Sequence, residues 1–132
     1  MHTPLPPFLY EIAEQLRTQD NRMTQNPMFC VQEKRRTYGM ESDERVWFDW
    51  EEGHECNPPE DPENPPEGVE HIGFHDQWFT VMTALTEAAC KQYLRANKHN
   101  HGETQIYVES FNRNHEMVAL REWLLTLHQP TE

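Results

Sequence analysis

One segment in the middle of the chain, residues 41–70, limits what the polypeptide can fold into. Five of the chain's ten prolines lie between residues 58 and 66, so no helix or central strand can run through this stretch. The segment also holds twelve acidic residues and one basic residue, which is −11 of the chain's net charge of −12. The remainder is almost neutral, with 11 acidic and 10 basic side chains. We therefore expect a nearly neutral domain with an acidic, proline-rich loop over residues 51–70.

The length and composition fit one small folded domain that spans residues 1–132. Hydrophobic residues make up 36% of the chain, and four Trp, six Phe and four Tyr supply much of the expected core. The sequence shows neither a membrane-spanning run nor a signal peptide, and its three cysteines are an odd number without a close pair. These features favour a protein of the reducing cytoplasm. The negative charge disfavours direct binding to nucleic acid or to anionic membranes.

Residue patterns predict three helices and about four strands. Helices are expected over residues 5–18, over 87–98 after the N-cap Thr86, and from a cap at Asn112 or Asn114 to about Leu127, with Leu120 and Leu124 facing the core. Strands are expected over 28–38, 45–50, 72–82 and 105–111, with 45–50 as the antiparallel partner of 28–38. The order α-β-β-β-α-β-α predicts an α+β fold, in which helices pack on a small antiparallel or mixed sheet.

Several stretches resemble a small protein family that is encoded by tailed bacteriophages and prophages. They are Thr18–Arg22, Asn26–Gly39, Phe79-Thr80, Tyr93–Asn100, Ile106–Ser110 and Arg113–Glu116. The resemblance extends over most of residues 8–125 but does not include the loop at 51–70. It implies a phage accessory protein that acts in the host cytoplasm, and neither a virion shell protein nor a replication enzyme. It implies no particular activity.

Two interpretations of the acidic segment are possible, a partner-binding surface or a solvated loop. Closely spaced carboxylates can imitate nucleic-acid phosphates and occupy a basic groove on a host protein, and electrostatic steering would speed that encounter. A surplus tryptophan beside the loop, Trp47 or Trp50, could anchor the contact. The alternative is a solvated loop that only aids solubility. On the first reading the partner-binding residues are Asp43, Glu44, Trp47, Asp49, Trp50, Glu51, Glu52, Glu55, Glu60, Asp61 and Glu63.

The first reading predicts a non-enzymatic protein that binds and blocks a host protein with a basic surface, such as a component of a CRISPR or restriction system. No cofactor, no catalytic residue and no metal site are expected. The nearest histidine and cysteine pairs, such as His54 with Cys56 and His71 with His75, lack the four ligands and short spacings of a zinc site.

Two other functional classes remain open. Glu109, Arg113, His115 and Glu116 cluster at a predicted strand end and helix start, and they could serve a small enzyme or a ligand-binding protein. A capped helix start explains the same residues without catalysis. A phage morphogenesis factor is the other class. The basic run Lys34-Arg35-Arg36 is expected to pair with the acidic segment within the fold.

Overall fold

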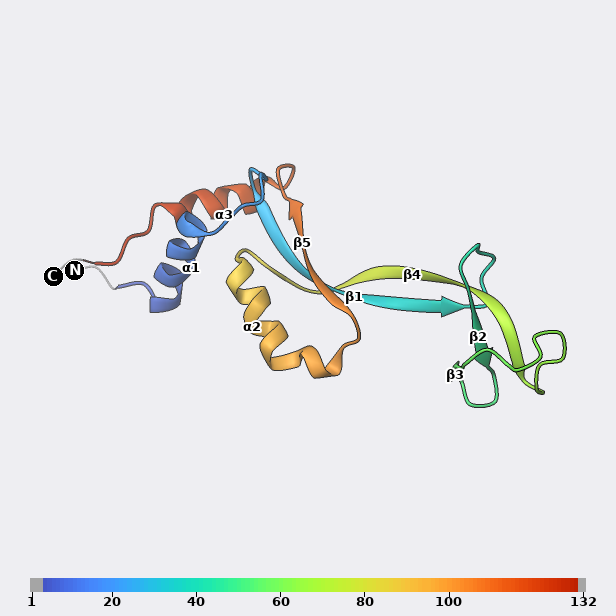
Figure 1. The fold of residues 1–132 in the computed structure, drawn as a ribbon. Coiled ribbons are helices and arrows are strands. Elements are labelled where there is room, and N and C mark those ends of the chain that lie inside the picture. The colour runs from blue at the N-terminus through green and yellow to red at the C-terminus, as the bar shows by residue number, and fades with distance from the viewer. Residues whose placement is uncertain (1–3, 131–132) are drawn as a thin grey trace. The chain divides into compact units, whose positions relative to one another are not determined.

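The computed structural model describes residues 4–130 and has an α+β fold with three α-helices, a short 3-10 helix and one sheet (Figure 1). The helices are α1 (Pro7–Thr18), α2 (Glu87–Asn97), η1 (Lys98–Asn100) and α3 (His115–Leu125). The strands are β1 (Pro27–Tyr38), β2 (Arg45–Asp49), β3 (His54–Glu55), β4 (Val69–Ala84) and β5 (Thr104–Ser110). The predicted class and the three helices are confirmed, and the sheet has five strands instead of about four.

The chain divides into two compact units. The first unit comprises the residues up to Glu33 and those from Phe79 onward, and the second unit is Lys34–Trp78. Strands β1 and β4 are long enough to contribute residues to both units, whereas β2 and β3 belong to the second unit alone. The acidic segment therefore lies entirely in the second unit.

The core of the first unit lies between the sheet and α2. Phe29, Val31 and Cys90 are almost completely buried, and half-buried apolar residues of β4, α2 and β5 pack against them. Ile106 and Val108 are among those residues, as their alternation in the sequence predicts. Helix α2 begins after Thr86, whose hydroxyl oxygen accepts a hydrogen bond from the amide of Ala89, so this predicted cap is confirmed.

Helix α3 packs against α1 and begins after Asn114, one of the two predicted caps, whose side-chain oxygen accepts a hydrogen bond from the amide of Met117. It differs from the prediction in two details. The helix ends at Leu125 and not at about Leu127. Leu124 is buried as expected, but Leu120 is exposed and the buried position is taken by Arg121. Apolar residues occur on both sides of this helix, so their periodicity alone could not identify the inner face.

The predicted pairing of 45–50 with 28–38 is wrong. The strand order is β3-β2-β4-β1-β5, so β2 pairs with β3 and β4, and β1 pairs with β5. The reason lies in the connection after β1, where the amides of Gly39 and Met40 both donate to the carbonyl of Gly73 in β4. The connection is therefore bound to β4, and the next strand, β2, pairs with β4 instead of β1.

The acidic loop is partly ordered by pairing. Residues 51–53 form a turn that leads into β3, a two-residue strand at one end of the strand order. Its register places Phe48 opposite Glu55 and Asp49 opposite His54. The sequence pattern gave no indication of this strand, which ends before the first loop proline. The prolines themselves lie in a turn and in stretches that are neither helix nor strand, as expected.

Candidate partner-binding surface

Aromatic rings form the interior of the second unit. Phe48 is buried, and its ring lies 4.4 Å from the ring of Tyr38 and 4.7 Å from that of Trp50. Trp47, on the other face of β2, stacks on His71 at 4.8 Å and is half-buried. Trp50 follows the end of β2 and remains 49% exposed. Of the two tryptophans proposed as anchors, Trp50 therefore has more surface to offer a partner.

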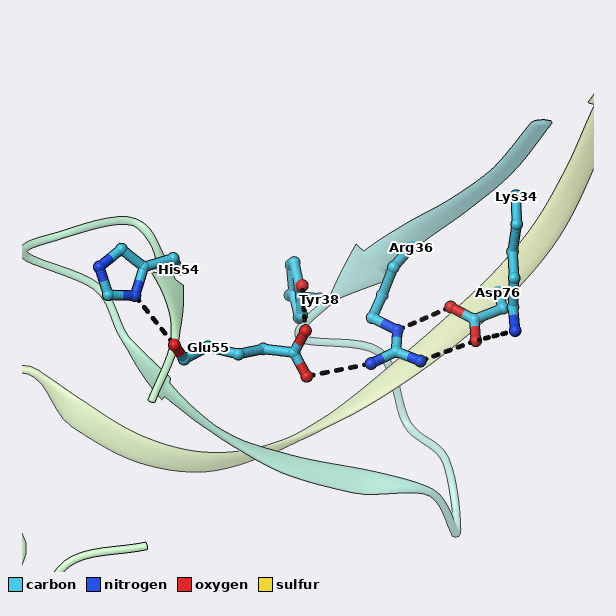
Figure 2. Close-up of polar contacts among 6 residues, drawn as sticks. All are labelled: Lys34, Arg36, Tyr38, His54, Glu55 and Asp76. Carbon is cyan, nitrogen blue, oxygen red and sulfur yellow. Dashed lines mark hydrogen bonds and ion pairs between the residues drawn. The ribbon is translucent and has the colours of Figure 1, made fainter. Parts of the chain in front are cut away.

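A network of charged and polar side chains joins three strands of this unit (Figure 2). Arg36 of β1 makes two contacts with Asp76 of β4, from Nε to Oδ1 at 2.7 Å and from Nη2 to Oδ2 at 2.9 Å. Its Nη1 donates to Oε1 of Glu55 in β3 at 3.0 Å, and the Tyr38 hydroxyl donates to the other oxygen of that carboxylate at 2.9 Å. Lys34 lies 3.6 Å from Asp76.

This network shifts the ionisation of its members. The hydrogen bonds and charge of Arg36 hold the pKa of Asp76 below its usual range, and Asp76 in turn raises the pKa of Arg36. Burial, followed by the hydrogen bond to Glu55, raises the pKa of the Tyr38 hydroxyl. The guanidinium of Arg36 also lies 3.8 Å from the ring centroid of Phe74. Arg36 thus fixes the position of Glu55, and it supplies part of the predicted pairing between the basic run and the acidic segment.

Other acidic residues of the segment shape its turns. Oδ1 of Asp49 accepts hydrogen bonds from the amides of Glu51 and Glu52, at 2.9 and 3.2 Å. The carboxylate of Glu52 lies 2.8 Å from His54. The pKa of His54 is raised, first by its hydrogen bond to the Glu55 carbonyl and then by Glu52 and Asp49. Asp49 and Glu52 therefore serve the local structure.

A second turn is built around Asp61. Its carboxylate accepts hydrogen bonds from the side-chain amide of Asn64 at 3.0 Å and from the backbone amide of Glu63 at 3.1 Å. These hydrogen bonds lower the pKa of Asp61. The loop is thus held by contacts of its own at this point, between the prolines.

The structure separates the predicted site residues into two groups. Asp49, Glu52, Glu55 and Asp61 are engaged by neighbouring groups, as described above. Within residues 4–130, five carboxylates of the predicted site make no side-chain hydrogen bond or ion pair, and all are exposed: Asp43, Glu44, Glu51, Glu60 and Glu63. These five, with Trp50, are the part of the predicted site that is free to contact a partner.

The sequence predicted that Arg36 pairs with the acidic segment but did not predict Asp76, which lies outside that segment, as its other partner. The signal for Asp76 was present, because strict alternation along β4 places it on the same face as Ile72 and Phe74, which are buried. A carboxylate on the buried face of a strand usually has a cationic partner. The basic run on the neighbouring strand provides one.

The cluster at 109–116 is also brought together in part. Residues 110–116 line an open hollow of about 890 Å³ in the first unit, and Arg113, His115 and Glu116 belong to its wall. Glu109 is not part of this wall. The residues come from a single connection and the first turn of α3, so their proximity follows largely from sequence adjacency.

No group of three or more His, Cys, Asp or Glu side chains in residues 4–130 is arranged to hold a metal ion. In the same part of the chain, no helix has the length and apolar character needed to cross a bilayer.

No protein-family model, curated protein or solved structure matches this chain. The resemblance to phage accessory proteins therefore remains a prediction from the residues quoted above, and the functional proposal depends on the chemistry of the second unit.

Proposed function

We propose that this protein is a phage-encoded, non-enzymatic accessory protein that binds a host protein through the acidic surface of its second unit and blocks it. The distribution of charge carries the proposal. Residues 34–78 hold 13 acidic and four basic side chains, a net charge of −9, whereas the rest of the chain has a net charge of −3. Two of those four bases, Lys34 and Arg36, are already paired with the unit's own carboxylates.

The free carboxylates support an electrostatic contact with a basic partner. Asp43 and Glu44 precede β2, and Glu60 and Glu63 lie in the loop, so negative charge is presented from two parts of one small unit. The ordered network around Arg36 and the turn at Asp61 limit the conformations of this unit before binding. Pre-ordering lowers the entropy lost on association.

The partner we infer is a host protein with a basic groove that normally binds nucleic acid. Carboxylates in such a groove would exclude the phosphate backbone, and the exposed ring of Trp50 would add an apolar or cation–π contact with an arginine or lysine of the partner. Host defence complexes that bind DNA or RNA in the cytoplasm, of the CRISPR or restriction kind, have grooves of this chemistry.

The test uses affinity purification of the tagged protein from host cells with two matched triple variants. One variant, Asp43→Asn with Glu60→Gln and Glu63→Gln, removes three unpaired charges from the second unit. The control variant, Glu11→Gln with Glu109→Gln and Glu122→Gln, removes three exposed charges from the first unit. Because steering accelerates association by roughly 10- to 1,000-fold, we expect the first variant to associate about tenfold more slowly or worse with the recovered host protein.

We expect the control variant to behave as the unmodified protein, and salt to release the bound host protein from both. Equal association rates for the two variants, or recovery of a partner that salt does not release, would contradict the proposal. Neither substitution set touches Glu55, Asp49 or Asp61, so the fold of the second unit should be retained.

A second function is favoured by the hollow at residues 110–116. Its wall combines Arg113 and His115 with the start of α3, which suits a small anionic ligand. If this site operated, His115→Ala would abolish binding of the ligand, and the acidic surface would be irrelevant to activity. The concentrated charge of the second unit favours the first proposal.

A further inference from the structure

Strand β5 is an edge strand of the sheet. It stands at one end of the order β3-β2-β4-β1-β5, so only one of its two sides is paired, in antiparallel register with β1. The amide of Phe111 donates to the carbonyl of Asn26, which continues this ladder and shows which residues of β5 are hydrogen-bonded to β1. The alternate residues direct their backbone amides and carbonyls away from β1, and they are Thr104, Ile106, Val108 and Ser110. Pro27, which has no amide hydrogen, accordingly lies opposite one of them, Ser110.

The outward side of β5 has none of the features that usually protect a sheet edge. Natural edge strands are blunted by lysine, proline, a bulge or short length. The strand at the other end of the order, β3, is protected in this way because it has only two residues. In contrast, β5 has seven residues, contains neither lysine nor proline, and pairs with β1 without a bulge. Within residues 4–130, no side chain and no loop backbone forms a hydrogen bond with its outward backbone groups.

The sequence of β5 is compatible with antiparallel pairing to a second copy of itself. A two-fold axis at Tyr107 would place this residue opposite Tyr107 of the second copy. The same register places Ile106 opposite Val108 and Gln105 opposite Glu109. The outward backbone groups of the two strands then face one another in phase. Glu109 is the only charged residue of β5, and it meets a neutral amide, so no like charges are directly opposed.

We propose that β5 is a dimerisation edge, at which two copies of this chain join their sheets about a two-fold axis at Tyr107. Backbone hydrogen bonds between the two strands provide the affinity, and the exposed Tyr107 rings form a cross-strand aromatic pair. A contact that uses the same surface on both copies closes on itself, so it gives a dimer and not a filament. Because the paired strands are short, the dissociation constant should be on the order of micromolar or weaker.

This contact is independent of the proposed host-binding surface. Strand β5 belongs to the first unit, which carries only −3 of the chain's charge, whereas the acidic surface belongs to the second unit. The two copies carry charge of the same sign, so added salt should not dissociate the dimer. Salt is expected to release the host protein, and the two contacts can therefore fail or succeed separately.

The test is sedimentation equilibrium of the full chain at concentrations from roughly 1 to 500 μM, the range that brackets a micromolar dissociation constant. Tyr107→Lys and Tyr107→Glu are measured alone and as an equimolar mixture. Trp123→Lys is the control, because Trp123 is an aromatic residue of α3 that is 45% exposed, close to the 49% of Tyr107. Each Tyr107 variant places like charges opposite one another at the axis, whereas the mixture places lysine opposite glutamate.

We expect the unmodified protein and Trp123→Lys to form dimers with the same affinity. Each Tyr107 variant alone should dimerise about tenfold more weakly, and the mixture should recover most of the loss. The proposal is overturned if the unmodified protein is monomeric over the whole range, which would leave the edge open to a strand of another protein. It is also overturned if the Tyr107 variants dimerise as the unmodified protein does, or if the mixture associates no more tightly than either variant alone.

Discussion

Substitution of Gly73 by alanine should break the contact that positions the start of the acidic surface. A Cβ atom at this position would collide with the carbonyl oxygen of Met40 and lie 3.1 Å from the amide nitrogen of Ser42. The connection at residues 39–44 would have to move away from β4. It would then lose the hydrogen bonds from Gly39 and Met40 to the Gly73 carbonyl and weaken the one from the Phe74 amide to Glu44.

The magnitude follows from these contacts. Two or three hydrogen bonds at about 1 kcal/mol each, together with overpacking worth roughly 1–3 kcal/mol, predict a loss of about 3 kcal/mol in the free energy of unfolding. Tryptophan fluorescence in a urea titration is a suitable assay, because Trp47, Trp50 and Trp78 belong to the second unit.

Gly102→Ala is the matched control. A Cβ atom on Gly102 would meet no other atom within 4 Å, so its effect should stay within about 0.5 kcal/mol. If the two alanine variants unfold at the same urea concentration, residues 39–44 do not pack closely against Gly73. The explanation for the position of β2 in the sheet would then be refuted as well.

Two further predictions concern ionisation and reactivity. Arg36 lowers the pKa of Asp76, so this pair stabilises the protein above about pH 4, and that stability is lost as the pH falls further. Asp76→Asn should therefore make the urea midpoint depend less on pH between pH 5 and roughly 2.5. A dependence unchanged from that of the unmodified protein would rule out the pair as a contributor. Burial raises the pKa of the Cys30 thiol and raises that of Cys90 to about 11. At pH 8 a thiol reagent should therefore modify the half-exposed Cys56 first, and should modify the two buried thiols only after denaturation. Rapid modification of all three thiols in the folded protein would contradict the packing around Phe29 and Cys90.

The local parts of the fold were predictable from the sequence. Helix starts depend on a few neighbouring residues. Residue type and position identified the cap at Thr86 and restricted the cap of α3 to Asn112 or Asn114, of which Asn114 is the actual one. Strand character at β1, β4 and β5 followed from alternation and β-branched or aromatic residues. The alternation also identified Ile106 and Val108 as core residues.

The order of the strands was not predictable in this way. Neighbouring strands in a sequence often pair, which favoured a hairpin between β1 and β2. The actual arrangement depends on a contact between residues 39–40 and Gly73, which are more than thirty positions apart. Such contacts leave no periodic signal. The two-residue strand β3 is too short to produce one.

The sequence predicted where the candidate site lies, but not which of its carboxylates are held by neighbouring side chains and which are free. Charge density located the acidic segment, but it could not distinguish Glu55, which Arg36 and Tyr38 hold, from Glu60, which makes no such contact. That distinction depends on which side chains the folded strands bring together.

Competition with nucleic acid tests the central claim most directly. The host protein recovered with this chain would be mixed with its labelled DNA or RNA, and increasing amounts of the unmodified protein or of the triple variant Asp43→Asn, Glu60→Gln, Glu63→Gln would be added. The account predicts that the unmodified protein displaces the nucleic acid, and that the variant needs at least about tenfold more protein for the same effect. A stable complex that contains all three components would contradict it.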